Sequence, residues 1–233
     1  IEENRHHIDA KKSYSPTWVL KCLPMQIMSA MTSYAHTTAW KYLFKKGIND
    51  MLQILETKDF DKAYALMDSS FPSDEHREYE EQKNLLADPK YTLYAIYDED
   101  TDDKNEEKYI KAIIAVFYFD DFAFIEHFAV NPIYRNQGLG SIILNELKTA
   151  LDCQICLEVE LPETENAKRR IGFYERNGFY LNKYSHTQPP LSEGGNPIPL
   201  YIMTSERAVD KKEFEHIQSV LFKGVYHTDQ NPK

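Results

Sequence analysis

The chain of 233 residues is 42% apolar and 27% charged, a composition typical of a globular protein with one sizeable core. Its formal net charge of −10 argues against nucleic acid as the main partner and suits a cationic or amine-bearing substrate. Cys22, Cys153 and Cys156 form no disulfide framework, which fits a reducing cytoplasm. Cys153 and Cys156 have C-x-x-C spacing without a second pair, so buried packing is favoured over a metal or redox site.

Residues 1–50 show no helical or strand period. The uncharged stretch from Cys22 to Trp40 is too polar for a membrane span, and no apolar core precedes a signal-peptide cleavage site. The codons for Lys45-Lys46-Gly47 can spell a purine-rich ribosome-binding sequence just before Met51. We therefore interpret residues 1–50 as a poorly ordered leader, derived from upstream or expression sequence, and Met51 as the natural start. A genuine N-terminal extension is the alternative.

A short strand and two helices are predicted between Met51 and Leu86. Residues 52–56 have the pattern of a strand, and a helix begins at Asp59. The apolar face of this helix is formed by Phe60, Ala63, Tyr64 and Met67. Ser73 is a good N-cap followed by acidic residues, so a second, highly charged helix is expected from Ser73 to about Leu86.

Three strands then form an antiparallel meander. Residues 91–97, 109–119 and 122–130 have strand character, and residues 98–108 form a polar acidic turn. Alternation along 122–130 places Glu126 on the same face as four apolar side chains, unless a bulge intervenes: Phe122, Phe124, Phe128 and Val130. Aromatic surroundings would raise the pKa of an unpaired Glu126 carboxyl toward the range of a general base. An ion-paired structural glutamate is the alternative, and His127 is a weaker candidate for the same role.

A tight polar turn with two glycines follows and leads into a helix. Apolar residues recur at helical spacing from 139 to 151: Leu139, Ile142, Ile143, Leu147, Ala150 and Leu151. The first N–H groups of a helix lack intrahelical acceptors, and glycines leave room for a phosphate to approach them. Arg135 adds a positive charge beside Gly138 and Gly140. The turn therefore predicts an anion site, although neither the P-loop nor the Rossmann pattern fits.

The rest of the chain completes an α/β fold with a mixed sheet flanked by helices. Strands are expected at 154–161, 179–184 and 200–204, with a helix after Pro162 that ends at Asn177-Gly178 and a loop over 188–199. Ala167, Ile171 and Tyr174 lie on one side of this helix. A last helix, from about Asp210 to Phe222, has an apolar side that must pack on the domain or on a second subunit.

The turn Arg135-Asn136-Gln137-Gly138-Leu139-Gly140 resembles the Arg/Gln-x-x-Gly-x-Gly/Ala pattern of GNAT-superfamily N-acetyltransferases. The segments Phe128–Pro132 before it and Ile171–Phe179 after it also resemble that superfamily in order and spacing. The resemblance covers roughly residues 51–204. It implies a GNAT-like, mostly antiparallel central sheet in which a splayed strand pair holds the cofactor. The implied domains are 51–205, the acetyltransferase domain, and 206–233, a C-terminal helical extension.

The resemblance implies acetyl-CoA as the acyl donor and no metal. Backbone groups of three strand residues would pair with the pantetheine arm, and the turn would hold the pyrophosphate. The implied cofactor-binding residues are Phe128, Ala129, Val130, Arg135, Asn136, Gln137, Gly138, Leu139, Gly140 and Ser141. The family often has an asparagine seven residues before its tyrosine, but that position here is Ala167, so no cofactor role is assigned to Asn166.

The resemblance also implies two catalytic residues, Glu126 as a base acting through water and Tyr174 as the acid that protonates the leaving thiolate. A core tyrosine is the alternative for Tyr174. In the family the first two helices wall the acceptor site, so Glu75, Glu78 and Glu81 either attract a substrate amine or form a solvated surface. The expected function is cytoplasmic N-acetylation of a small amine, by a monomer or homodimer without nucleic-acid or membrane partners. The alternatives are acetylation of a protein N-terminus or lysine, and a non-catalytic acyl-CoA-binding module.

Overall fold

The structure, a computed structural model, describes residues 51–98, 109–151, 153–191 and 194–228. The leader interpretation of residues 1–50 and most of the acidic turn expected over 98–108 therefore lie outside the described residues. No helix in the described ranges is long and apolar enough to cross a membrane.

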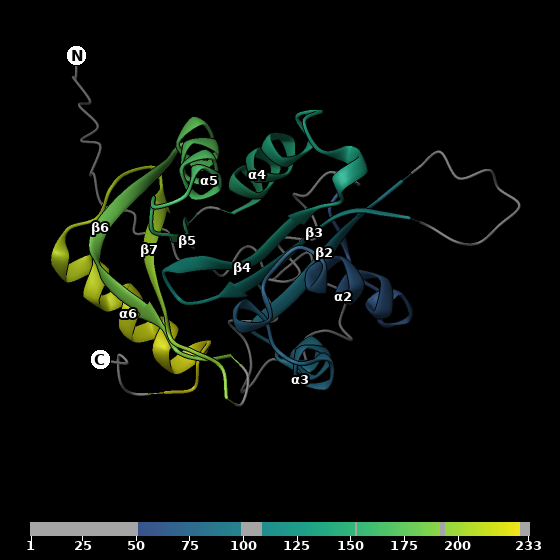
Figure 1. Ribbon diagram of the computed structural model, residues 1–233, viewed down its shortest axis with the longest axis horizontal. Coiled ribbons are helices and arrows are strands. Elements are labelled where there is room, and N and C mark those ends of the chain that lie inside the picture. The colour runs from purple at the N-terminus through teal and green to yellow at the C-terminus, as the bar shows by residue number, and fades with distance from the viewer. Residues whose placement is uncertain (1–50, 99–108, 152, 192–193, 229–233) are drawn as a thin grey trace, which may run out of the picture.

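A seven-stranded sheet forms the centre of the fold, in the order β1-β2-β3-β4-β5-β7-β6 (Figure 1). β4 and β5 are parallel, and every other pair of neighbouring strands is antiparallel. This sheet confirms the predicted mixed, mostly antiparallel fold. The strands are β1 (Gln53–Ile54), β2 (Tyr91–Tyr97), β3 (Ile110–Tyr118), β4 (Phe122–Val130), β5 (Gln154–Glu160), β6 (Phe179–Gln188) and β7 (Ile198–Ser205).

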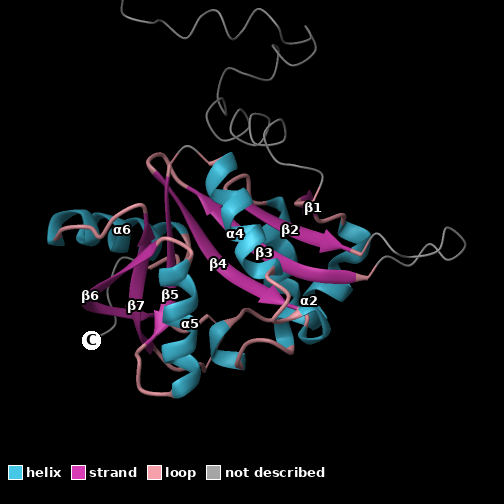
Figure 2. Ribbon diagram, turned by 90° about the horizontal axis from the view of Figure 1, so that it is seen from above, coloured by secondary structure: helices cyan, strands magenta, loops and turns pink. Residues whose placement is uncertain are grey.

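Helices cover both faces of the sheet. Figure 1 shows α4 and α5 on one face and α2, α3 and α6 on the other, and Figure 2 looks onto the face that α4 and α5 cover. Two separate apolar clusters fill the two layers, since α2 and α6 share one cluster and α4 and α5 share the other. The helices are α2 (Phe60–Asp68), α3 (Tyr79–Asn84), α4 (Leu139–Ala150), α5 (Glu165–Arg176) and α6 (Lys211–Gly224).

The predicted start of the second helix at Ser73 is wrong, whereas its second half is confirmed by α3 and a 3-10 helix over Leu85–Ala87. Ser73–Glu75 form only a 3-10 turn, the backbone is extended at His76, and α3 begins at Tyr79. His76 and Arg77 are 6% and 7% exposed. The local sequence favours a continuous surface helix through His76 and Arg77. The burial of these two polar side chains against the sheet outweighs that local preference and keeps the backbone out of a helix there.

The last two strands, β6 and β7, are longer than predicted, and the last helix, α6, packs on the domain. β6 extends to Gln188 rather than Tyr184, and β7 begins at Ile198, so the predicted loop is shorter. α6 packs its apolar side on the domain itself, with Phe214, Ile217 and Leu221 in the same cluster as the sheet. The sequence left this choice open between the domain and a second subunit.

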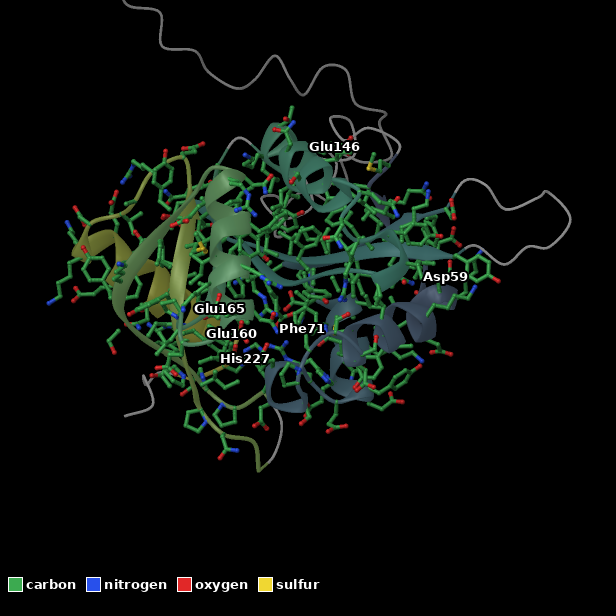
Figure 3. All side chains as sticks on the ribbon, turned by 45° about the horizontal axis from the view of Figure 1, so that its top comes forward. Asp59, Phe71, Glu146, Glu160, Glu165 and His227 are labelled. Atoms are coloured by element: carbon green, nitrogen blue, oxygen red, sulfur yellow. The ribbon has the colours of Figure 1, made fainter. Side chains whose placement is uncertain are left out.

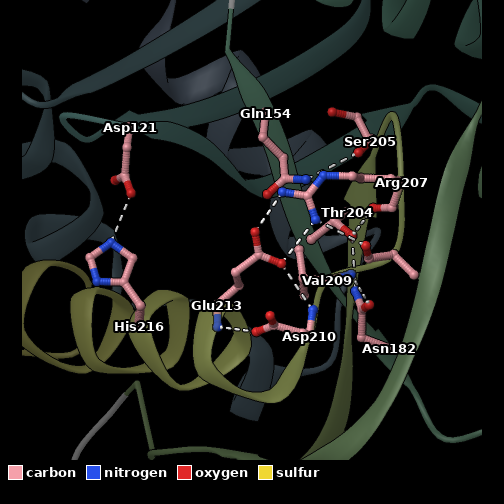
Figure 4. Close-up of polar contacts among 11 residues, drawn as sticks. Asp121, Gln154, Asn182, Thr204, Ser205, Arg207, Val209, Asp210, Glu213 and His216 are labelled. Carbon is pink, nitrogen blue, oxygen red and sulfur yellow. Dashed lines mark hydrogen bonds and ion pairs between the residues drawn. The ribbon is translucent and has the colours of Figure 1, made fainter.

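Polar contacts fix the start of α6 on the sheet (Figure 4). Asp210 and Glu213 form a capping box, and Glu213 also binds Arg207. Val209 N donates to Asn182 Oδ1 at 2.9 Å, and His216 lies 2.8 Å from Asp121. Satisfied backbone donors at a helix start stabilise the helix, so these contacts anchor α6 to β6 and to the turn before β4.

Candidate active site

β4 and β5 separate halfway along their length. They pair from Phe122–Gln154 to Ile125–Leu157, and no pairing continues beyond Ile125. The remaining half of each strand still pairs with its outer neighbour, β3 or β7. The splay therefore leaves one edge of each strand without a partner strand among the described residues.

A cavity of about 280 Å³ opens where the two strands separate. Phe71 and Glu160, labelled in Figure 3, belong to its lining. The lining also includes the splayed half of β4 and ionisable side chains from several elements: Glu75, Glu126, His127, Arg135, Glu158, Arg170 and Tyr174. One cavity thus brings together the strand edge, an acidic group of side chains and the tyrosine singled out by the sequence.

The glycine turn lies next to this cavity and begins α4. Gly138 has φ 79° and is the N-cap of α4, and Asn136 has φ 62°. A Cβ on Gly140 would lie 3.1 Å from the Phe173 ring, so the close approach of α5 favours glycine there. Ser141 N and Ile142 N both donate to Gly138 O, at 3.0 and 3.1 Å, so the N–H groups that precede Ser141 are the ones left to meet an anion. Ser141, which the resemblance also implies as a cofactor-binding residue, therefore already uses its N–H within the helix.

Arg135 does not project freely beside the turn. Its Nε donates to the Val130 carbonyl at 2.8 Å, which ties the turn to the end of β4. Gln137 Nε2 donates in the same way to Ile133 O at 3.1 Å. Arg135 nevertheless lines the cavity, so the cavity wall includes a positively charged residue of the turn that leads into α4.

Glu126 is positioned by a bulge in β4. Ala115 pairs with His127 and Val116 pairs with Ile125, so Glu126 has no partner residue on β3. The strict alternation expected from the sequence therefore fails here. Phe128 and Val130 contact the α4–α5 cluster, whereas Phe122 and Phe124 belong to the other cluster.

The expected rise in the pKa of Glu126 is wrong. Arg77 Nη1 donates to Glu126 Oε1, and His127 Nδ1 lies 3.3 Å from Oε2. Burial alone would raise the pKa of the Glu126 carboxyl, but Arg77 and then His127 outweigh it and hold the pKa at about 2. The structure thus has the alternative that the sequence left open, an ion-paired glutamate.

His127, the weaker candidate for the general base, is a packed histidine. It is 2% exposed, its ring lies 4.9 Å from the Phe71 ring, and its Nε2 lies 2.9 Å from the Glu75 carbonyl oxygen. Because a carbonyl oxygen only accepts, Nε2 carries a proton and donates it. His127 thereby links the bulge of β4 to the turn before α3.

Glu75 is the cavity carboxyl with a raised pKa. Burial is the main cause, and the nearby negative charge of Glu160 adds to it, while Arg170 lowers the pKa by a smaller amount. Arg170 also forms an ion pair with Glu160 at 2.8 Å. Glu78 and Glu81 are exposed and lie outside the cavity lining, so among the three candidates only Glu75 reaches the site.

Tyr174 lies in the last turn of α5 and lines the cavity. Its side chain is 8% exposed and packs edge-on against Phe179, with ring centroids 5.7 Å apart. Burial raises the pKa of the Tyr174 phenol to about 12. The hydroxyl is therefore protonated at neutral pH and can act as a proton donor.

Sequence reasoning missed a second buried carboxylate and its partners. Glu158 lines the cavity from β5, and its two oxygens bind His186 Nε2 and the Tyr226 hydroxyl. The period of β5 places Glu158 and Glu160 on one face, which is a weak signal for such a site. Nothing in the local sequence could indicate His186 or Tyr226, because both are far from Glu158 along the chain.

The comparisons identify the class. A profile described as "Acetyltransferase (GNAT) family" matches residues 50–179. The chain belongs to the GNAT acetyltransferase family, and the resemblance read from the glycine turn is confirmed.

One solved structure supports this assignment. A protein from Bacteroides thetaiotaomicron, described as a candidate GNAT-family acetyltransferase, is 35% identical, with a TM-score of 0.67 over 75% of this chain and 97% of its own. A variant of spermidine N-acetyltransferase from Vibrio cholerae is 15% identical, with a TM-score of 0.48 over 66% and 93%. A ribosomal-protein alanine N-acetyltransferase from Escherichia coli is 21% identical, with a TM-score of 0.47 over 69% and 96%. The last two are too distant to carry an argument. The comparison with curated proteins found no match.

Proposed function

We propose that the protein is a cytoplasmic N-acetyltransferase that transfers the acetyl group of acetyl-CoA to a primary amine by direct attack in a ternary complex. The observation that carries the proposal is the cavity at the β4–β5 splay. It joins the strand edge of β4, the positive charge of Arg135 next to the α4 N-terminus, and several carboxylates.

The residues present fit acetyl-CoA. The Gly138 backbone has a left-handed conformation with no atom within 4 Å of an added Cβ, so a phosphate can approach the start of α4 from that side. The edge of β4 from Phe128 to Val130 offers backbone groups to an extended amide-bearing arm, as a partner strand would. Asn136, Gln137, Leu139 and Ser141 complete the proposed cofactor site, with the contribution of Ser141 resting on its side chain because its N–H already donates to Gly138.

The acceptor amine is expected to be cationic. Glu75, Glu126, Glu158 and Glu160 all line the cavity, against Arg135 and Arg170. Carboxylates in a partly enclosed site favour an ammonium group over an anion. The acceptor must then lose a proton before its nitrogen can attack the thioester.

We assign this proton transfer to Glu75 rather than to Glu126. A carboxylate with a pKa of about 2 is a weak base, and Arg77 already uses one oxygen of Glu126. Glu126 instead contributes fixed negative charge. The pKa of Glu75 is raised and it faces the same cavity, so it is better matched to a proton transfer near neutral pH.

Tyr174 supplies the opposite proton transfer. Acetyl-CoA supplies an activated thioester, and a thiolate leaves when the acetyl group moves. The Tyr174 hydroxyl is protonated at neutral pH because its pKa is about 12, so it can donate its proton to the leaving sulfur. The burial of Tyr174 in α5 and its position in the cavity lining support this role.

A panel of acceptors tests the proposal directly. Purified protein is incubated with acetyl-CoA and polyamines, aminoglycosides, N-terminal peptides or lysine peptides, and free thiol is followed. Acceptor-dependent thiol release with a matching mass increase of the acceptor supports an N-acetyltransferase and identifies the acceptor class. Tight acetyl-CoA binding without turnover across the panel would instead favour a non-catalytic acyl-CoA-binding module.

A further inference from the structure

The segment that follows α6 contacts Glu158, which lines the cavity, and Arg77, which holds Glu126. Arg77 Nη2 donates to the Val225 carbonyl at 2.9 Å, while Arg77 Nη1 holds Glu126. The next residue, Tyr226, donates its hydroxyl to Glu158 Oε2 at 2.5 Å. Two neighbouring residues at the end of α6 thus support two carboxylates of the cavity.

Glu158 is held by a chain of donors that also begins in α6. Gln218 Nε2 lies 3.1 Å from His186 Nδ1 and 3.2 Å from the Ser185 carbonyl, so the amide donates and Nδ1 accepts. The proton of His186 is then on Nε2, which donates to Glu158 Oε1. Both oxygens of Glu158 therefore accept a hydrogen bond. One comes from His186, which Gln218 of α6 orients, and the other comes from Tyr226, just after α6.

These contacts are buried. The side chains of Glu158 and His186 are 8% and 0% exposed. His186 stacks on Phe222 with ring centroids 5.7 Å apart, and Phe222 in turn contacts the Tyr226 ring. A buried carboxylate needs donors to keep its charge, and each of its oxygens can accept a second bond beyond the one that it receives here. Glu158 is thus fixed by two donors and can still bind a donor that enters the cavity.

We propose that Tyr226 is a positioning residue for acceptor binding: its hydroxyl fixes the Glu158 carboxylate so that Glu158 binds the positive charge of the acceptor amine. The C-terminal segment is then part of the catalytic site rather than an appendage to the domain. This inference rests on the proposed function, because it assumes an amine acceptor in the cavity.

Tyr226→Phe tests the inference, since it removes only the hydroxyl and keeps the ring against Phe222. Tyr184→Phe is the matched control, because the Tyr184 ring also packs on α6, 4.9 Å from Phe214, and lies outside the cavity lining. The readouts are the KM for the best cationic amine in the panel, the KM for an aromatic amine that is neutral at the assay pH, and the KM for acetyl-CoA.

Tyr226→Phe should raise the KM for the cationic amine about 10-fold to 100-fold, the scale of one hydrogen bond to a charged group. The KM for acetyl-CoA and for the neutral amine should stay within about 2-fold, and Tyr184→Phe should match the wild type. Gln218→Leu removes the donor that orients His186 and should raise the KM for the cationic amine by a smaller factor. This variant tests the inference if Tyr226→Phe does not fold. An unchanged KM for the cationic amine, or an equal rise for both amines, overturns the inference.

Crystal structures of the wild type and Tyr226→Phe give a readout that needs no turnover. The inference expects the Glu158 carboxylate to leave its wild-type position in the variant. A carboxylate in the same place would overturn the inference even for an active enzyme. A wild-type protein that acetylates no amine, by contrast, sinks the proposed function, and the two failures are thereby distinguished.

Discussion

Arg77 and Glu126 form a buried ion pair that joins the turn before α3 to the bulge of β4. Their side chains are 9% and 4% exposed, and 49 positions of sequence separate them. Arg77 also binds the Val225 carbonyl, so one guanidinium connects three distant parts of the chain. The pair explains why Glu126 stays ionised despite its burial.

Removing the Arg77 guanidinium should destabilise the fold. Arg77→Met leaves the Glu126 carboxylate buried without its partner, and breaking a buried ion pair from one side typically costs about 3–5 kcal/mol. The free energy of unfolding, measured by urea denaturation at pH 7, should fall by that order. Arg169→Met is the control, because Arg169 is exposed on α5. Equal stability of the two variants would contradict the structural role of Arg77.

The same pair predicts how stability depends on acid. The pKa of Glu126 is lowered from 4.5 to about 2 in the folded protein, so its contribution to stability is fully present above pH 4.5. That contribution is lost as the pH falls from 4.5 toward 2. Glu126→Gln has no such ionisation, so its stability should lie below that of the wild type at pH 7 and approach it between pH 4.5 and 3. Urea unfolding across this range checks the prediction, and two parallel curves would refute it.

Most of the fold could be predicted because its elements carry strong local patterns. Alternation located β2, β3 and β4, and helical spacing located α2, α4 and α5 within a few residues. The buried face of α4 was predicted less accurately. Ile142, expected to be buried, is 46% exposed, whereas Leu144 is fully buried. The start of the second helix, expected at Ser73, was wrong because the burial of His76 and Arg77 depends on groups that are distant in sequence.

The site was only partly predictable for the same reason. The glycine turn and Tyr174 are local patterns, so a resemblance could find them. The bulge at Glu126 depends on the register with β3, and period-2 alternation cannot show it. Arg77 and Tyr226 lie 49 and 68 positions from their carboxylate partners, and no spacing rule links residues so far apart.

The glycine turn should control cofactor affinity. Gly138→Asp and Gly140→Asp each place a carboxylate where the phosphate is expected, so the Kd for acetyl-CoA should rise at least about 10-fold. Gly140→Asp also presses its Cβ toward Phe173, whereas Gly138→Asp meets no atom within 4 Å. The variant at Gly138 is therefore the cleaner test of charge, and isothermal titration calorimetry measures it.

Gly194→Asp is the matched control for Gly138→Asp. Gly194 also has φ 79° and open space around it, so the substitution causes a similar backbone strain outside the glycine turn. It should leave the Kd for acetyl-CoA unchanged. Unchanged affinity in both Gly138→Asp and Gly140→Asp would remove the basis for placing the pyrophosphate at this turn.

Tyr174→Phe should separate chemistry from packing. The variant keeps the ring against Phe179 and removes only the hydroxyl, so stability should change little while kcat falls roughly 10-fold to 1000-fold. The pKa of the phenol is about 12, so no loss of the proton donor is expected in the wild-type profile below about pH 11. A wild-type kcat in Tyr174→Phe, with chemistry shown to be rate-limiting, would make Tyr174 a core residue only.

The last prediction decides between Glu75 and Glu126 as the base. The base must be ionised to accept a proton, so kcat/KM of the wild type should rise as the pH passes the pKa of Glu75, which burial and Glu160 raise above its ordinary value. Glu75→Gln should lose roughly 100-fold or more in kcat/KM near neutral pH and recover partly at high pH, where more of the acceptor is already neutral. Glu126→Gln, compared at a temperature where both variants are folded, should keep a profile parallel to that of the wild type. If Glu126→Gln shows the recovery at high pH and Glu75→Gln does not, the base is Glu126 and the assignment to Glu75 is wrong.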